Sequence, residues 1–269
     1  MSSQHLLLSD GPFNLIRLYF SLILVFWVLA THADTISVAS ASNFMSTLKN
    51  LVELYELESP HKVQVSYGSS GKLYTQIRHG APFELFLSAD QHKCELLEKE
   101  GYSMPGSRRT YARGRLALWR KHKQVGGVNL STLQAGSFRK LAMANPNLAP
   151  YGAAALEFLE AEGLVTKTKQ SWVVGENIAQ AFQYVFSGNA EIGLVALAQV
   201  LSLPEEQAGD SWIVPDALYH PINQDLVILK KGENAATISF WKFLLGETAQ
   251  EVIARSGYLR ASSSRASAE

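Results

Sequence analysis

The sequence predicts an α/β protein in which a mainly parallel sheet is flanked by helices. Two observations predict this fold. Short apolar segments typical of buried strands alternate with amphipathic helical segments, and small or hydroxyl-bearing residues stand where several of the helices begin. The chain has 269 residues, 47% of them hydrophobic and 18% charged. That is enough for a sizeable core, in one large domain or in two lobes of roughly 100–130 residues each.

The first part of the chain contains three strand–helix units. Residues 35–41 (TISVASA) form the first predicted strand, and a helix follows at once because five apolar residues share one helical face: Phe44, Leu48, Leu51, Val52 and Tyr55. Residues 63–67 form the second strand, and after the loop 68–71 comes a helix carrying Leu73 and Ile77. Residues 84–88 form the third strand, which leads into a helix around Leu96 and Leu97 that Gly101 closes.

The second part of the chain repeats this alternation. Further strands are predicted at 115–119, 141–144, 172–174, 192–197 and 226–229. Helices are predicted over 153–162, after the loop 145–152, over a segment containing Ile178 and Phe186, and over 238–245. The polar tail, residues 261–269, is predicted to be disordered.

Residues 1–33 are predicted to be a signal peptide. Arg17 precedes an apolar stretch thirteen residues long, 18–30, and Thr31 and Ala33 supply the short residues of a cleavage site before Asp34. Thirteen residues are too few to cross a hydrocarbon core of about 30 Å as a helix. A retained N-terminal anchor is the alternative, because the segment that precedes the apolar stretch is long.

The composition excludes several kinds of partner and chemistry. Lys+Arg and Asp+Glu both number 24, so no net charge attracts nucleic acid or an anionic membrane, and a bound anion must be held locally. The single cysteine, Cys94, cannot form an intramolecular disulfide, and the seven histidines show no metal-ligand spacing. We therefore expect no cofactor and no metal ion ligated directly by the protein.

Small or hydroxyl-bearing residues stand at the start of four predicted helices: Ser-Asn at 42–43, Ser-Ser-Gly at 69–71, Tyr-Gly at 151–152 and Asn-Ile at 177–178. The first N–H groups of a helix have no partner within it and carry a partial positive charge. In an open parallel sheet these helix starts gather at the carboxyl ends of the strands. Ordinary N-capping explains each junction alone, but the four together predict an anion site built without a salt bridge.

Five segments occur in order along the chain: SVASASNF, SYGSSGKLYTQIRHGAPFELFLSAD, MPGSRRTYARGRLALW, ANPNLAPYGAAALE and EIGLVALAQ. Together they resemble the periplasmic molybdate-binding proteins (ModA-like) of ABC importers. The resemblance runs from about residue 35 to residue 258. Its most specific stretches are GSSGKLYTQI with GAPFELFLSAD, and NPNLAPYG.

The resemblance implies an exported, periplasmic receptor of the type II binding-protein fold. Each of its two lobes is a mixed, mostly parallel sheet flanked by helices, and the lobes close over a tetrahedral oxyanion. Lobe I is expected over residues 34–112 and 222–260, and lobe II over residues 113–221. The resemblance further implies a protein that is not an enzyme and that delivers molybdate, and tungstate, to a cognate ABC permease and ATPase. We expect a monomer that does not bind nucleic acid.

Matched position by position, the resemblance implies that the oxyanion contacts five residues through hydroxyl, amide and backbone N–H donors: Ser42, Asn43, Ser70, Tyr151 and Ile178. Ser69 and Lys72 are candidate additional contacts. The contacts are made to the oxygens, with no direct ligation of the metal atom. Some family members supply a tyrosine hydroxyl just after the strand 192–195. This chain has Ala196 there, so Tyr151 is the candidate to replace that donor.

Two alternatives remain open at the level of the sequence. A sulfate or phosphate receptor would share the architecture. Phosphate, however, carries a proton that needs an acceptor, and sulfate must be excluded by its smaller size. A serine hydrolase with a Ser-Lys pair is the alternative from another class, because Ser69-Ser70-Gly71-Lys72 fits S-x-x-K. The same pattern at 46–49 and 137–140, and the lack of S-D-N and K-T-G motifs, disfavour catalysis.

Overall fold

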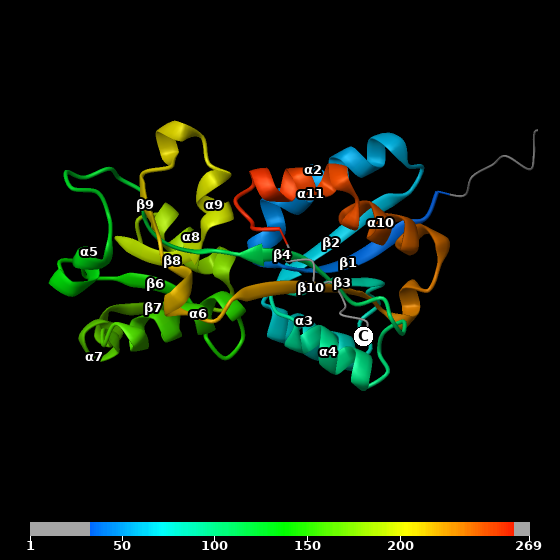
Figure 1. Ribbon diagram of the computed structural model, residues 1–269, viewed down its shortest axis with the longest axis horizontal. Coiled ribbons are helices and arrows are strands. Elements are labelled where there is room, and N and C mark those ends of the chain that lie inside the picture. The colour runs from blue at the N-terminus through cyan, green and yellow to red at the C-terminus, as the bar shows by residue number, and fades with distance from the viewer. Residues whose placement is uncertain (1–32, 261–269) are drawn as a thin grey trace, which may run out of the picture.

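The computed structural model describes residues 33–260, which form two lobes, each built on a five-stranded sheet. In Figure 1 the first lobe lies on the right, in blue, cyan, orange and red, and the second lies on the left, in green and yellow. The predicted disordered tail and, except for Ala33, the predicted signal peptide lie outside the described residues. No helix among residues 33–260 is both long and apolar enough to span a membrane.

The first lobe takes its elements from both ends of the described chain. Its strands are β1 (Thr35–Ala41), β2 (Lys62–Gly68), β3 (Leu85–Leu87), β4 (Arg109–Gly114) and β10 (Ile222–Ile228). Its helices are η1 (Ser42–Phe44), α2 (Met45–Glu58), α3 (Ser70–Arg78), α4 (His92–Lys99), η5 (Lys230–Gly232), α10 (Ala235–Leu245) and α11 (Glu247–Arg255).

The second lobe is formed by the middle of the chain. Its strands are β5 (Leu116–Arg120), β6 (Leu141–Ala144), β7 (Trp172–Gly175), β8 (Ile192–Ala196) and β9 (Asp210–Ile213). Its helices are α5 (Leu130–Ala135), α6 (Pro150–Ala161), α7 (Val165–Thr168), η2 (Lys169–Ser171), α8 (Ile178–Phe186), α9 (Leu197–Leu201), η3 (Glu205–Gln207) and η4 (Asp216–Leu218).

The two sheets share one plan. Their strand orders are β2-β1-β3-β10-β4 and β7-β6-β8-β5-β9. In each sheet three neighbouring strands are parallel, and the fourth, β10 or β5, is antiparallel to both of its neighbours. Four strands of each sheet therefore run in one direction, which confirms the predicted mixed, mostly parallel sheets. The antiparallel strand is in each case the first one that the chain forms after it crosses from the other lobe.

Helices cover both faces of each sheet, as the nearly continuous apolar strands require. Along β1, Ile36 and Val38 pack in the cluster that contains Leu48 of α2 and Phe240 of α10. Ala39 points to the other face, against α3 and α4. In the second lobe, one face packs against α6 and the other against α8. The carboxyl ends of the parallel strands, where the helices begin, are thereby left as the edge open to a ligand.

The chain crosses between the lobes twice, and the two crossings are tied together. The first crossing runs through Arg115, between β4 and β5, and the second leads from β9 through η4 to β10. The Tyr219 hydroxyl accepts a hydrogen bond from the Leu116 backbone N–H (3.1 Å) and donates one to Asp216 Oδ1 (3.1 Å). The Tyr219 side chain therefore joins the second crossing to the start of β5, the strand that follows the first crossing.

We expect the tie at Tyr219 to make the protein sensitive to high pH. Burial raises the pKa of the Tyr219 hydroxyl from 10.0 to about 12. A phenol with a higher pKa in the folded state stabilises that state fully below pH 10, and the stabilisation is lost as the pH rises towards 12. Two pKa units correspond to about 3 kcal/mol. Unfolding free energy measured by denaturant titration between pH 9 and 12 should therefore fall less steeply in Tyr219→Phe than in the wild type. Equal slopes would contradict this interpretation.

Candidate functional site

Four helix starts of the two lobes meet at one cavity. Eleven residues line this small cavity: Ala41, Ser42, Asn43, Gly68, Ser69, Ser70, Ala89, Ala149, Pro150, Tyr151 and Ile178. They belong to the ends of β1 and β2, to the first residues of η1, α3, α6 and α8 and to the N-caps of α3 and α6, with Ala89 following β3. The structure thus brings together all five residues predicted to contact an oxyanion, and Ser69 with them.

Two serine hydroxyls lie at the start of α3, and each already accepts a hydrogen bond from the protein. Ser69 is the N-cap of α3, and its Oγ accepts a weak hydrogen bond from the Lys72 backbone N–H (3.4 Å). Ser70, which is 1% exposed, accepts a hydrogen bond at Oγ from the Ala89 backbone N–H (3.0 Å). Because that bond occupies an acceptor position, Ser70 is set to donate its proton to an occupant of the cavity.

The first junction contacts the second lobe directly. Ser42 Oγ donates a hydrogen bond to Asn177 Oδ1 (3.2 Å) and accepts one from the Ala179 backbone N–H (3.4 Å). Asn43 Nδ2 donates to Gln224 Oε1 (2.9 Å) and to the Tyr258 hydroxyl (3.1 Å). The side-chain nitrogen of Asn43 is therefore committed within the protein, and the donor left for an anion is the backbone N–H at the start of η1.

In the second lobe the helix starts of α6 and α8 face the cavity. Pro150 is the first residue of α6, a position that proline favours because the missing N–H would have no helical partner. The helix thus begins three residues before the predicted start, and Tyr151 lies in its first turn. Asn177 caps α8 by accepting a hydrogen bond from the Gln180 N–H (3.0 Å), which leaves the Ile178 N–H without a partner in the helix.

The cavity is lined by neutral groups only. None of the eleven lining residues carries an acidic or basic side chain, and burial raises the pKa of the Tyr151 hydroxyl far above its usual value, so that it stays protonated. Hydroxyl protons and first-turn N–H groups are donors, and they gather here without a carboxylate. Such an arrangement binds anions and repels cations. No group of three or more His, Cys, Asp or Glu side chains suited to a metal ion occurs within residues 33–260.

The lobes touch each other at the rim of the cavity. The Gly71 backbone N–H donates to the Leu148 carbonyl across the cleft (3.0 Å), and a Cβ at Gly71 would lie 3.0 Å from that same oxygen. Lys72 Nζ forms an ion pair with Glu176 (3.0 Å), and both side chains are about half exposed. Lys72 thus does not line the cavity, as a candidate anion contact would, but bridges the two lobes beside it.

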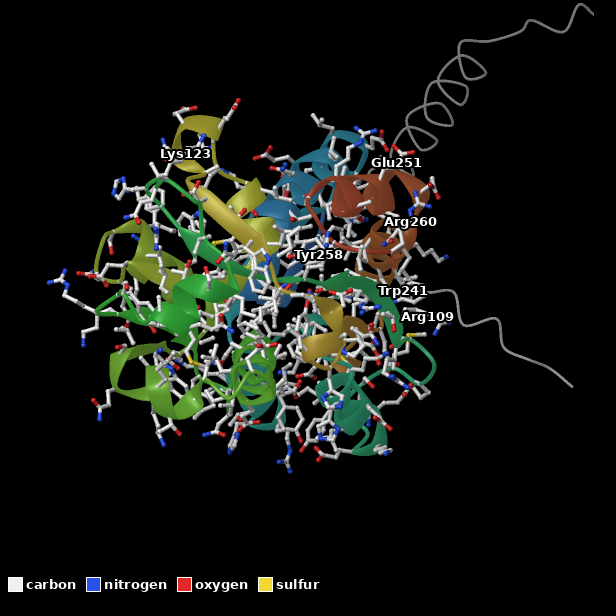
Figure 2. The ribbon with its side chains drawn as sticks, turned by 60° about the vertical axis from the view of Figure 1, so that its left-hand side comes forward. Arg109, Lys123, Trp241, Glu251, Tyr258 and Arg260 are labelled. Atoms are coloured by element: carbon white, nitrogen blue, oxygen red, sulfur yellow. The ribbon has the colours of Figure 1, made fainter. Side chains whose placement is uncertain are left out.

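Polar residues that were not predicted from the sequence lie beneath the cavity. Gln224, Tyr111 and Tyr258 are buried. Gln224 bonds directly to Tyr111 and to Tyr151, and Asn43 links it to Tyr258. Figure 2 shows Tyr258 near the middle of the molecule. Its hydroxyl donates to the Asn43 backbone carbonyl (2.9 Å). The sequence contains one signal for them: β10 (INQDLVI) carries polar residues before the apolar segment 226–229 that was predicted as a strand.

The chain is similar to known proteins over nearly all of the described residues. The family model described as bacterial extracellular solute-binding protein matches residues 36–259. The molybdate-binding protein ModA of Azotobacter vinelandii is 44% identical over 247 residues, 91% of this chain and 98% of that protein. The ModA of Rhodobacter capsulatus is 39% identical over 236 residues, 86% of this chain and 90% of that protein.

A solved structure shows the same architecture. The periplasmic molybdate-binding protein of Azotobacter vinelandii aligns with a TM-score of 0.81 and 35% sequence identity, over 84% of this chain and 99% of that one. The match confirms the two-lobed fold that the sequence predicted.

We expect Gly152→Ala to destabilise the protein and displace the start of α6. A Cβ at Gly152 would lie 2.4 Å from the Ala144 carbonyl oxygen, a backbone atom of β6 that cannot turn aside. Overpacking of this kind costs about 1–3 kcal/mol, measurable by denaturant unfolding. Gly246→Ala is the control, because its nearest neighbour, the Phe243 carbonyl oxygen, lies at 3.2 Å. Equal losses in the two variants would contradict the close packing of α6 on β6.

Proposed function

Because the chain belongs to the family of bacterial extracellular solute-binding proteins, we propose that it captures molybdate and delivers it to an ABC transporter. The observation that carries the proposal is the uncharged cavity between the lobes, formed by the starts of four helices. The identity to proteins named molybdate-binding supports the choice of ligand.

The chemistry of the cavity suits an oxyanion without protons. Molybdate is a dianion whose oxygens are all acceptors, so the Ser70 hydroxyl and each free N–H can be satisfied at once. A buried donor left without an acceptor costs about 1–3 kcal/mol. Tungstate has the same charge and nearly the same size, and we propose it as a second ligand. Sulfate, being smaller, cannot reach all of the donors together.

The surroundings of the serines support a binding role over a catalytic one. A Ser-Lys hydrolase needs the lysine amine beside the nucleophilic hydroxyl. Lys72 Nζ instead pairs with Glu176, and it is the Lys72 backbone N–H that bonds to Ser69. Ser70 bonds to the Ala89 N–H. These contacts favour a protein that binds its ligand and releases it unchanged.

Export, lobe limits and partners complete the proposal. The apolar stretch 18–30 supports export through a signal peptide over residues 1–33. The distribution of strands over the two sheets supports two bodies that open and close about the two crossings. We propose residues 34–112 with 222–260 and residues 113–221 as their limits, with residues 113 and 114 moved to the first body because they belong to β4. We propose a monomeric receptor that works in the periplasm with a cognate permease and its ATPase.

A thermal-shift titration of the mature protein, residues 34–269, tests the proposed ligand. Molybdate and tungstate at 1,000 times their dissociation constants should add about 4 kcal/mol of stability, which raises the melting temperature clearly. Sulfate and phosphate should shift it little. If only sulfate or phosphate shifts the melting temperature, that ion and not molybdate is the ligand. If none of the four oxyanions shifts it, the anion-binding function is refuted.

We expect Ser70→Ala to weaken molybdate binding by about 1–3 kcal/mol, because a charge-assisted hydrogen bond to the anion is lost. Isothermal titration calorimetry measures the change. The same variant also leaves the Ala89 N–H unpaired, so the stability of the ligand-free protein is measured separately. Ser187→Ala, at the exposed end of α8, is the control and should keep wild-type affinity. Equal affinity of Ser70→Ala and the control would remove Ser70 from the site.

A further inference from the structure

Gln224 joins the two lobes beneath the cavity. It lies on β10, 0% exposed, at a register shift between Gln224 and Asp225. Its Oε1 accepts hydrogen bonds from Asn43 Nδ2 of the first lobe (2.9 Å) and from the Tyr111 hydroxyl (2.9 Å). Its Nε2 donates to the Tyr151 hydroxyl of the second lobe (3.3 Å). One carboxamide thus contacts two of the five residues proposed to bind the anion.

The direction of this carboxamide is fixed by its neighbours. Tyr111 is fully buried, and burial raises the pKa of its hydroxyl far above the usual value, so it keeps its proton. Asn43 Nδ2 is likewise a donor. If the carboxamide were turned round, its own N–H groups would face both of these donors. The arrangement therefore favours Oε1 towards Asn43 and Tyr111, and Nε2 towards Tyr151.

The Tyr151 hydroxyl is consequently an acceptor towards the protein. It faces the Gln224 Nε2 on one side and the Arg115 backbone N–H on another. A phenol accepts at two positions and donates one proton. With N–H groups at both acceptor positions, donation is the function left to it. Gly114 allows this close approach, because a Cβ there would lie 2.1 Å from the Tyr151 hydroxyl and 2.7 Å from Gln224 Nε2.

We propose that Gln224 is a positioning residue that makes the site reject protonated oxyanions, by holding Tyr151 as a donor towards the cavity. The inference rests on the proposed oxyanion function and deepens it. Molybdate and sulfate have no proton and accept from Tyr151. Monohydrogen phosphate must place its O–H somewhere, and at Tyr151 that proton meets another donor. Discrimination against phosphate at the Tyr151 position then depends on Gln224, while discrimination against sulfate depends on size.

Gln224→Glu and Gln224→Leu test the proposal. The first keeps acceptor oxygens for Asn43 and Tyr111 and replaces Nε2 by an oxygen, so that Tyr151 donates to the introduced carboxylate instead of to the anion. The second removes both functions of the carboxamide at similar volume. Dissociation constants for molybdate, sulfate and phosphate are measured by calorimetry at a pH where phosphate is the monohydrogen dianion. The three ligands then carry equal charge, so an added negative charge cancels from their ratios.

The expected result is a roughly tenfold fall in the preference for molybdate over phosphate, the cost of one unmatched hydrogen bond, with the preference for molybdate over sulfate unchanged. Tyr151→Phe should give the same fall, and combining it with Gln224→Leu should add nothing further. Asn223→Leu is the matched control. Asn223 is the neighbouring residue on β10, and it lines a separate groove, with Gln91 and His220, outside the cavity. It should keep all of the wild-type ratios.

Either of two results overturns the proposal: wild-type ratios in both Gln224 variants, or an equal fall in the phosphate and sulfate ratios, which would show general loosening of the site. A fall in Gln224→Leu alone supports it, because a protonated glutamic acid can still donate to Tyr151. The dissociation constants of the wild-type protein test the proposed molybdate-binding function separately. If sulfate binds best, the ligand assignment fails and the sulfate-to-phosphate ratio tests Gln224. If phosphate binds best, or no oxyanion binds, both proposals fail.

Discussion

The unpaired N–H groups at four helix starts are the constraint on which the rest of the structure depends. Each N–H group needs a hydrogen-bond acceptor, and a buried N–H group that lacks one destabilises the fold. Two of the helix starts lie in each lobe, so neither lobe alone can surround an anion. The lobes must meet closely. Gly71 accordingly lies against the Leu148 carbonyl, and Gly152 packs the start of α6 on the end of β6. A small tetrahedral dianion offers acceptors to several such donors at once, which is why the proposed anion site lies between the lobes.

The duplicated sheet plan explains how two such halves come to face each other. Each lobe receives one antiparallel strand, β10 or β5, directly after a crossing. The crossings leave the first lobe as hydrogen-bonded neighbours, with Gly114 of β4 opposite Ile222 of β10. Two adjacent connections form a hinge, and Tyr219 ties them together. In Figure 1 both connections run side by side between the lobes. The hinge therefore lies against the cavity, since Gly114, next to the first crossing, also leaves space for Tyr151 and Gln224.

Much of the fold and most of the candidate site follow from local sequence. The strands β1, β3, β6 and β8 are apolar runs buried on both faces, and a helix start after a strand is a local signal. The polar strand β4 (RTYARG) and the half-exposed edge strand β9 lacked such a run and were not predicted. Neither was the Gln224 network, because its partners lie 181, 113 and 73 residues away. The ion pair of Lys72 could not be predicted for the same reason: the sequence shows that Lys72 follows Ser70, but not that its amine pairs with Glu176, 104 residues further along.

A cavity without formal charge has a consequence for the whole particle. A site that holds its ion with arginine or lysine compensates the charge of its cargo locally, whereas a neutral site leaves that charge uncompensated. Here the protein has equal numbers of acidic and basic side chains, and the lining residues neutralise nothing. The loaded receptor therefore becomes a net dianion, whereas the unloaded one is close to its isoelectric point. The two states therefore differ in net charge and in electrophoretic mobility.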